Sequence, residues 1–403
     1  MSEQDQTNQG AALAEGSGRL VSLDAYRGLV MLMMASGGLG IAQVAGHFKG
    51  SEVWRVLAEQ TEHAEWVGCT VWDMIQPSFM FIVGAALPYS LARRRAKGQS
   101  FGRMLFHAIV RAVVLVGLGI LLRSVGKERT YFTFEDVLTQ IGLGYVFLFL
   151  LGWVKARWQF SAAAVILAGY WGLFALWPLP AAGFDYQKVG VGPEWKRLEG
   201  FAAHWEKNTN AAAKADEWLL NKFPPRGAFA YNKGGYLTAN FVPSLGTMVF
   251  GLLAGTLLLS GLKRWAKFLI LVGAGITGVA AGWALDWGGI CPLVKRIWTP
   301  SWAVYAGGWT SLTLAVFYLM LDWPGWRWWA LPLTVVGMNS IAMYCMAHLF
   351  DGFISENIKV HLGSKVFQSL GVVYEPMVAQ GAVLVVLWLI CVWMYRRKMF
   401  VRI

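Results

Sequence analysis

The sequence predicts an all-α membrane protein: a polytopic bundle of about ten transmembrane helices. Hydrophobic residues make up 56% of the 403 residues, and charged residues only 14%. The chain also contains 22 Trp, a residue that is enriched at membrane surfaces. Most directly, about ten apolar runs of roughly 18 to 23 residues are each long enough to cross about 30 Å of hydrocarbon as a helix. A soluble globular protein does not have this composition.

The predicted spans fall into two groups of five, separated by a long loop between helices 5 and 6. They cover 24–46, 69–92, 104–122, 137–154, 158–177, 241–260, 265–284, 300–321, 329–350 and 377–395. Residues 1–18 are polar and lack an apolar core, so we expect a disordered cytoplasmic tail and no cleaved signal. The first five helices then lie in 19–177, the loop in 178–240 and the last five helices in 241–403.

The long loop is predicted to fold as an extracytoplasmic cap. It is longer than a simple connection between helices, and its Trp and Tyr residues alternate with charged ones. Aromatic rings next to Lys, Arg, Asn and Asp are the side chains that stack on sugars and hydrogen-bond to them. The alternative explanation is an aromatic belt at the membrane surface. We expect the loop to cover a site.

The charge distribution predicts that both termini are cytoplasmic. When the N-terminus is placed inside, the excess of Lys and Arg over Asp and Glu in the inner segments equals the whole net charge of +12. These basic residues lie at helix ends and form no tract, so they indicate topology and give no support for a nucleic-acid partner. The sequence contains no Asn-x-Ser/Thr acceptor, which favours a bacterial inner membrane over a glycosylated lumenal protein.

The cysteines predict neither disulfides nor a metal site. Cys69, Cys291, Cys345 and Cys391 are scattered, with no Cys-x-x-Cys pair and no histidine nearby at metal-ligand spacing.

His63 is the most informative residue in the chain. It lies just before a predicted span that carries Asp73, and an acid inside an apolar run is costly to keep without a function. Imidazole changes its protonation near neutral pH, so His63 and Asp73 are both candidate catalytic residues. Ten residues of continuous helix would separate them by about 15 Å, which predicts that they do not touch unless the segment turns back, and Gly68 or Pro77 would allow such a turn or kink. We therefore expect Asp73 to hold a polar network with Arg111 or Asn339.

Other polar residues form a second group of candidates. Asp24 and Arg27 are at i,i+3 spacing in the first span, where we expect an ion pair that is either structural or part of the site. Arg111 lies within the third span, and a buried Arg suits phosphate or carboxylate recognition. We predict that Arg111, Lys295 and Asn339 bind an anionic cofactor or line the internal cavity. The candidates for substrate contact are Trp66, Gly68, Trp298, Thr299 and Ser301.

Six segments, in this order, resemble the heparan-alpha-glucosaminide N-acetyltransferase family and its bacterial membrane acyltransferase relatives. The similar segments are Arg19–Gly28, His63–Gly68, Asp73–Gly84, Val137–Tyr145, Pro292–Ser301 and Gly337–Tyr344. Two positions depart from the family pattern: Gly38 stands where the family often has Asn, and Gln140 replaces an Arg. These departures affect the acceptor more than the type of reaction.

The resemblance implies an acyltransferase that moves an acetyl group from cytoplasmic acetyl-CoA to an amine or hydroxyl of an extracytoplasmic sugar. His63 would act either as the general base or as the carrier of the acetyl group. The expected partners are acetyl-CoA, a sugar or glycan acceptor and the lipid bilayer, with a homodimer left open and no permanently bound cofactor. Two other classes also remain open: a proton-coupled transporter or flippase of a glycan-type solute, and a membrane scaffold without catalysis.

Overall fold

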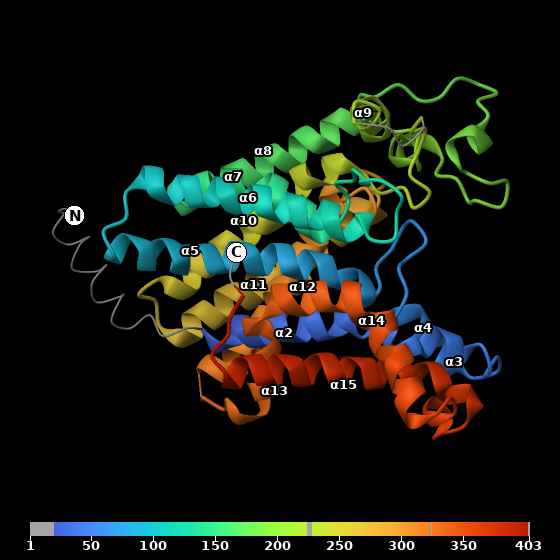
Figure 1. Ribbon diagram of the computed structural model, residues 1–403. Coiled ribbons are helices and arrows are strands. Elements are labelled where there is room, and N and C mark those ends of the chain that lie inside the picture. The colour runs from blue at the N-terminus through green and yellow to red at the C-terminus, as the bar shows by residue number, and fades with distance from the viewer. Residues whose placement is uncertain (1–19, 224–227, 324, 402–403) are drawn as a thin grey trace. The chain divides into compact units, whose positions relative to one another are not determined.

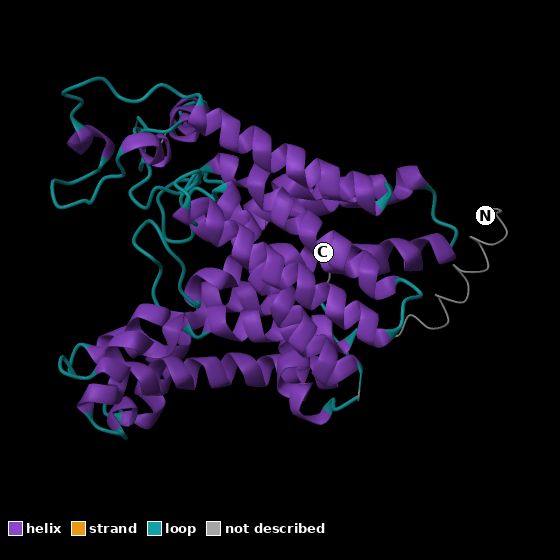
Figure 2. Cartoon of the chain, turned by 180° about the vertical axis from the view of Figure 1, so that it is seen from behind, coloured by secondary structure: helices purple, strands orange, loops and turns teal. Residues whose placement is uncertain are grey.

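The computed structural model describes residues 20–223, 228–323 and 325–401. In these ranges the chain consists of helices and loops and contains no strand (Figure 2). The predicted tail at 1–18 lies outside the described residues. The α-helices, in chain order, are α2 (Val21–Ala35), α3 (Ile41–Ala45), α4 (Glu52–Gln60), α5 (Ile75–Ala96), α6 (Phe101–Ser124), α7 (Val137–Leu151), α8 (Ala156–Ala175), α9 (Ala211–Leu220), α10 (Phe241–Leu259), α11 (Arg264–Trp287), α12 (Pro300–Phe317), α13 (Leu331–Met338), α14 (Ser340–Leu362) and α15 (Glu375–Arg396).

The all-α membrane fold class is confirmed. Among the described residues, 7 helices are long and apolar enough to cross a membrane, and 2 further helix pairs qualify if each bent pair is one span. The bent pairs are Val21–Ala35 with Gly37–Ala45, at 46°, and Trp328–Met338 with Ser340–Leu362, at 69°. Val137–Leu151 is apolar but shorter. Each predicted run therefore has a helical counterpart, while the predicted number of about ten spans stays a prediction.

The described chain forms two compact units. Unit 1 contains Met80–Leu312, and unit 2 contains Leu20–Phe79 together with Thr313–Ile403. The boundaries fall within α5 and α12, so the chain passes from one unit to the other inside a helix in both places. The segment around His63 belongs to unit 2, and the 178–240 loop belongs to unit 1.

In unit 1, α10 packs against both α7 and α8, and α6 packs against α7 (Figure 1). Glycine lets α10 approach the unit 1 part of α5 very closely. A Cβ added at Gly84 would lie 1.8 Å from the carbonyl oxygen of Met248, and one at Gly251 would lie 1.9 Å from that of Phe81. Small residues at helix interfaces are the usual means of close packing in membranes.

In unit 2, α2 packs against α13 with the same type of contact. A Cβ at Gly28 would lie 1.8 Å from the carbonyl oxygen of Leu333, and a Cβ at Gly337 would lie 1.9 Å from that of Asp24. The atoms that would clash belong to the backbone, so no side-chain rotation relieves the overlap. The contact between α2 and α13 therefore requires glycine on both helices.

The break between α2 and α3 also depends on glycine. Four successive residues from Gly37 to Gly40 have φ between 52° and 71°, in the left-handed region. This conformation is readily available to Gly and costs energy for Leu39. A Cβ at Gly38 would lie 3.4 Å from Cβ of Thr61, so position 38 adjoins the segment that leads to His63.

The 178–240 loop contains folded elements. Besides α9, it holds the short 3-10 turns Tyr186–Val189, Gly200–Trp205 and Thr238–Asn240. Glu206 is 2% exposed, and its carboxylate accepts hydrogen bonds from the Trp195 indole and from the backbone N–H groups of Leu198 and Lys207. A buried carboxylate with three donors fixes the surrounding chain. The prediction of a folded segment is therefore supported, while its role as a cap stays a prediction.

Asp216 joins α9 to the entry of α10. It is 4% exposed, and its Oδ2 accepts a hydrogen bond of 2.9 Å from the backbone N–H of Thr238. Burial raises the pKa of Asp216 to about 6, against a partial lowering by the hydrogen bonds from Thr238. The protonated form is therefore favoured in the folded loop over the unfolded chain.

The glycine contact of unit 2 makes a stability prediction. We expect Gly28→Ala to destabilise the protein by about 1–3 kcal/mol, because the new methyl group forces the α2 and α13 backbones apart. Thermal unfolding in detergent measures the effect. Gly352→Ala in α14 is the matched control, because a Cβ there meets no atom within 4 Å, and we expect it to be neutral or stabilising by up to about 1 kcal/mol. Equal melting temperatures for Gly28→Ala and wild type would contradict the contact.

Asp216 makes a prediction about pH. Because its folded pKa is raised, its contribution to stability is fully present below the unfolded value near 3.8 and is lost as pH rises through about 6. The loss amounts to at most about 3 kcal/mol. We expect hydrogen exchange in α9 to be better protected at pH 4.5 than at pH 7.5, after correction for intrinsic rates. Asp216→Asn removes the ionisation and should flatten this dependence; an unchanged pH dependence in the variant would argue against the assignment.

Candidate functional site

The segment between α4 and α5 turns back on itself, which brings distant residues together. Helix α4 ends at Gln60, and the next helical turn is the 3-10 segment Trp72–Met74 that leads into α5. Between them, Gly68 has a φ of 118°, a conformation that residues with a side chain rarely adopt. The chain can therefore reverse between positions 63 and 73.

His63 and Asp73 form a direct pair. Nδ1 of His63 lies 2.7 Å from Oδ1 of Asp73, a short hydrogen-bond distance. The side chain of Asp73 is 1% exposed, whereas that of His63 is 37% exposed. A buried carboxylate thus holds one nitrogen of an imidazole ring that solvent can reach.

The expectation that His63 and Asp73 do not touch is wrong. That expectation assumed a continuous helix from His63 to Asp73, and the structure has an irregular segment there. The Gly68 turn and the late start of α5 remove the separation of about 15 Å that ten helical residues would impose.

The second oxygen of Asp73 is also fully used. Oδ2 accepts hydrogen bonds of 3.1 Å from the backbone N–H groups of Ala64 and Thr70, and it lies 3.1 Å from the Thr70 hydroxyl. A carboxylate has about four lone-pair positions, and here the donors surround both oxygens. These bonds hold the carboxylate plane in one orientation.

The segment that carries His63 has further anchors. The Thr70 hydroxyl donates a 2.7 Å hydrogen bond to the carbonyl oxygen of Glu62, and the backbone N–H of Val71 donates to Oε1 of Gln60 at 3.0 Å. Within the described residues, the carboxylates of Glu62 and Glu65 make no hydrogen bond or ion pair. The hydrogen bonds that Ala64 and Thr70 make to Asp73 thus fix the carboxylate that holds the His63 ring.

The sequence indicated Gly68 as a turn but missed the role of Thr70. The signal was present, because Thr70-Val71-Trp72-Asp73 has the spacing of a capping box. Trp66 in the same segment is 5% exposed, so it packs into the protein. Substrate contact by Trp66 and Gly68 stays a prediction.

The two predicted partners of Asp73, Asn339 and Arg111, lie in different units. Asn339 lies in unit 2 with Asp73, but its amide binds the C-terminal segment instead: Nδ2 donates to the Met399 carbonyl, and Oδ1 accepts from the Val401 N–H, both at 3.1 Å. It ties the α13–α14 break to the chain end, and cofactor contact by Asn339 stays a prediction.

Arg111 lies in unit 1, where its Nη1 is 3.1 Å from the Tyr145 hydroxyl and its guanidinium carbon is 4.6 Å from the centre of the Tyr145 ring. Its buried Nε has no hydrogen-bond partner within the described chain. A charged group with an unused buried donor in a membrane span is a candidate ligand contact.

The remaining candidates lie in both units. Asp24 and Arg27 approach to 3.7 Å on α2, as the i,i+3 spacing predicted. In unit 1, Lys295 is 5% exposed, with its Nζ 5.8 Å from the centre of the Tyr236 ring.

The other three predicted contacts of unit 1 hold a tight turn before α12. Trp298 is 1% exposed with a φ of 47°, and its indole donates to Oγ1 of Thr247 at 3.2 Å. Thr299 and Ser301 are 0% exposed and lie 3.1 Å apart through their hydroxyls. The contacts of these three side chains stabilise the turn. Substrate contact by them stays a prediction.

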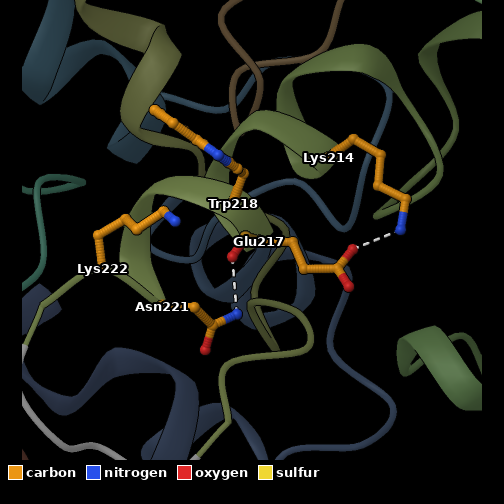
Figure 3. A pocket seen from close by; sticks show the side chains of 5 residues that line it. All are labelled: Lys214, Glu217, Trp218, Asn221 and Lys222. Atoms are coloured by element: carbon orange, nitrogen blue, oxygen red, sulfur yellow. Dashed lines mark hydrogen bonds and ion pairs between the residues drawn. The ribbon is translucent and has the colours of Figure 1, made fainter.

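A shallow pocket lies elsewhere, on one face of α9 (Figure 3). The lining residues are Lys214, Glu217, Trp218, Asn221 and Lys222. Figure 3 shows Glu217 paired with Lys214, and Asn221 donating a hydrogen bond to the Glu217 backbone. These groups contain no histidine, cysteine or other activated nucleophile. The pocket therefore does not compete with the His63–Asp73 pair as a catalytic site, and no group of three metal-ligating side chains occurs in the described ranges.

Comparison with known proteins finds one matching family model and two relatives that share one name. Residues 19–187, which include His63, Thr70 and Asp73, match a family described only as a domain of unknown function, DUF5009. Across 96% of its length the chain is 24% identical to the human heparan-alpha-glucosaminide N-acetyltransferase and 21% identical to the one from Mus musculus. It spans 60% of the length of either relative. The resemblance to the heparan-alpha-glucosaminide N-acetyltransferase family that the sequence motifs indicated is thereby confirmed over almost the whole chain.

Proposed function

We propose that this protein is a membrane acyltransferase that moves an acetyl group from cytoplasmic acetyl-CoA to an amine or hydroxyl of an extracytoplasmic sugar. The observation that carries the proposal is the pair of a buried Asp73 and an exposed His63 at a distance of 2.7 Å. The names of the similar proteins support the reaction class and an amino sugar as the acceptor. The bacterial inner membrane, with both termini in the cytoplasm, is the proposed location.

The pair is suited to proton transfer. With the Asp73 carboxylate accepting from Nδ1–H, the imidazole is held in the tautomer whose basic nitrogen is Nε2. The ionised carboxylate also stabilises the imidazolium that forms when Nε2 takes a proton. The 37% exposed side chain of His63 gives an acceptor access to the ring. His63 is therefore the proposed catalytic base, and Asp73 its orienting partner.

Nε2 of His63 can both take and return the proton that moves during acetyl transfer. The acceptor nitrogen or oxygen attacks the thioester carbonyl carbon, and Nε2 of His63 takes the proton that this atom loses. When the carbon–sulfur bond breaks, the imidazolium returns the proton to the sulfur, which gives the acetylated sugar and CoA with a free thiol. Alternatively, Nε2 attacks the thioester carbonyl carbon and CoA leaves as the thiolate. The acceptor then attacks the acetyl carbon, the bond to Nε2 breaks, and the proton that the acceptor loses goes to the CoA thiolate.

For the donor, we propose Arg111 and Lys295 as contacts of acetyl-CoA. The support for Arg111 is its buried Nε without a partner, and the support for Lys295 is a cation kept 5% exposed beside an aromatic ring. Both are cations of the kind that binds phosphate groups.

Loss of His63 should abolish the reaction. We expect His63→Ala to lower acceptor-dependent CoA release by about 10²–10⁴-fold, because the general base is lost. Asp73→Asn should cause a loss in the same range, because the amide can no longer stabilise the imidazolium. The measurement is release of free thiol by purified protein in detergent, with acetyl-CoA and a panel of amino sugars and neutral sugars.

The matched control is His47→Ala, which removes an exposed histidine of the same unit and should leave the rate unchanged. Full activity of a folded His63→Ala variant would reject the proposed chemistry. Solute accumulation without thiol release would instead favour the transporter alternative.

The proposed sidedness has its own test. Glu62 is exposed and lies next to His63, so a cysteine at this position reports which side of the membrane the pair faces. In a background with Cys69 and Cys345 replaced, we expect Glu62→Cys to react with an impermeant maleimide in intact cells. Labelling that occurs only after lysis would place His63 in the cytoplasm and overturn the topology.

A further inference from the structure

We propose that Thr70 is a positioning residue for the His63–Asp73 pair: its hydroxyl joins the backbone at Asp73 to the chain just before His63 as one rigid unit. This inference rests on the proposed function, because it assigns Thr70 a role in the reaction of that pair. Four hydrogen-bond distances within unit 2 support it, and each involves Thr70 with Asp73 or Glu62.

The first part of the argument is a reciprocal cap at the start of the helical segment. The backbone N–H of Asp73 donates to the Thr70 hydroxyl at 3.3 Å, and the backbone N–H of Thr70 donates to Oδ2 of Asp73 at 3.1 Å. This is the arrangement of a capping box, with Asp in the place of the usual Glu. The carboxylate that holds His63 is therefore also the carboxylate that closes the helix end.

The second part is the single hydroxyl proton of Thr70. A hydroxyl donates one hydrogen bond and accepts up to two. The short 2.7 Å distance assigns the proton to the Glu62 carbonyl, while Asp73 Oδ2 lies at the longer distance of 3.1 Å. Glu62 immediately precedes His63 in the chain. Thr70 thus connects the backbone on one side of His63 to the residue that binds its ring.

The third part of the argument concerns the contacts that remain when valine replaces Thr70. Valine has nearly the shape of threonine, and the N–H groups of residues 64 and 70 would still bind Oδ2. The carboxylate would then keep these two donors, but the Asp73 backbone would lose its connection through the hydroxyl to the Glu62 carbonyl. We therefore expect the ring and the carboxylate to lose their relative alignment, which weakens catalysis more than it weakens folding or donor binding.

The test is a pair of variants with opposite expectations. Thr70→Val should lower kcat by about tenfold or more, with the KM for acetyl-CoA changed by less than about threefold, because alignment acts on the transition state. Thr70→Ser keeps the hydroxyl and should stay within about threefold of wild type. If Thr70→Ser loses as much activity as Thr70→Val, the methyl group matters instead of the hydroxyl, and the proposal is overturned.

A double-mutant cycle separates positioning from simple helix capping. If the hydroxyl acts through Asp73, adding Thr70→Val to Asp73→Asn should cost less than about threefold, although it costs about tenfold alone. An equal loss in both backgrounds would show that the hydroxyl acts independently of Asp73, which overturns the proposal.

Thermal unfolding in detergent is measured for every variant. If Thr70→Val does not fold, Thr70→Ala is the second hydroxyl deletion, and failure of both to fold would assign Thr70 a purely structural role, against the proposal. The result for His63→Ala keeps the two hypotheses apart. Activity that survives His63→Ala rejects the proposed function, whereas activity that is lost in His63→Ala but normal in Thr70→Val rejects only the role of Thr70.

Discussion

The Asp73 carboxylate is the interaction on which the candidate site depends. It is 1% exposed, and it binds the His63 ring, the N–H groups of Ala64 and Thr70, and the Thr70 side chain. Burying a charge is expensive unless hydrogen bonds compensate for the lost water. Here the compensating donors come from the segment that carries the histidine. The same hydrogen bonds that compensate for burying the acid therefore also fix the position of His63.

Glycine provides the frame around this segment. Gly28 and Gly337 allow the backbones of α2 and α13 to meet, and Gly37 and Gly40 let the chain break after α2 against Gln380 and Pro376 of α15. All these contacts lie in unit 2, together with His63 and Asp73. Without a strong hydrophobic force between helices in lipid, close backbone packing of this kind supplies much of the stability of the bundle. The irregular segment that carries His63 is therefore part of a unit whose helices are closely packed.

The sequence predicted the fold well because length and hydropathy determine where helices cross lipid. It did not predict the breaks at Gly37–Gly40 and Asn339, because a helix can continue through such residues and only tertiary contacts decide. The same assumption of continuity caused the error at His63 and Asp73, which both belonged to the predicted site but were expected to lie apart. For Trp298, Thr299 and Ser301, polar and aromatic character near a span suggested substrate contact, which stays a prediction, and the structure shows that these buried side chains also hold a turn. Residue type alone does not separate these two uses.

The short separation of ten residues between His63 and Asp73 has a kinetic consequence. Closing a loop of this length takes about 10–100 ns, and its entropy cost is small. A thermal fluctuation that breaks the pair is therefore repaired within a very small fraction of one turnover of a typical enzyme, which takes about a millisecond to a second. Momentary opening of the pair would lower the rate only by the fraction of time spent open. It would not introduce a slow step of its own.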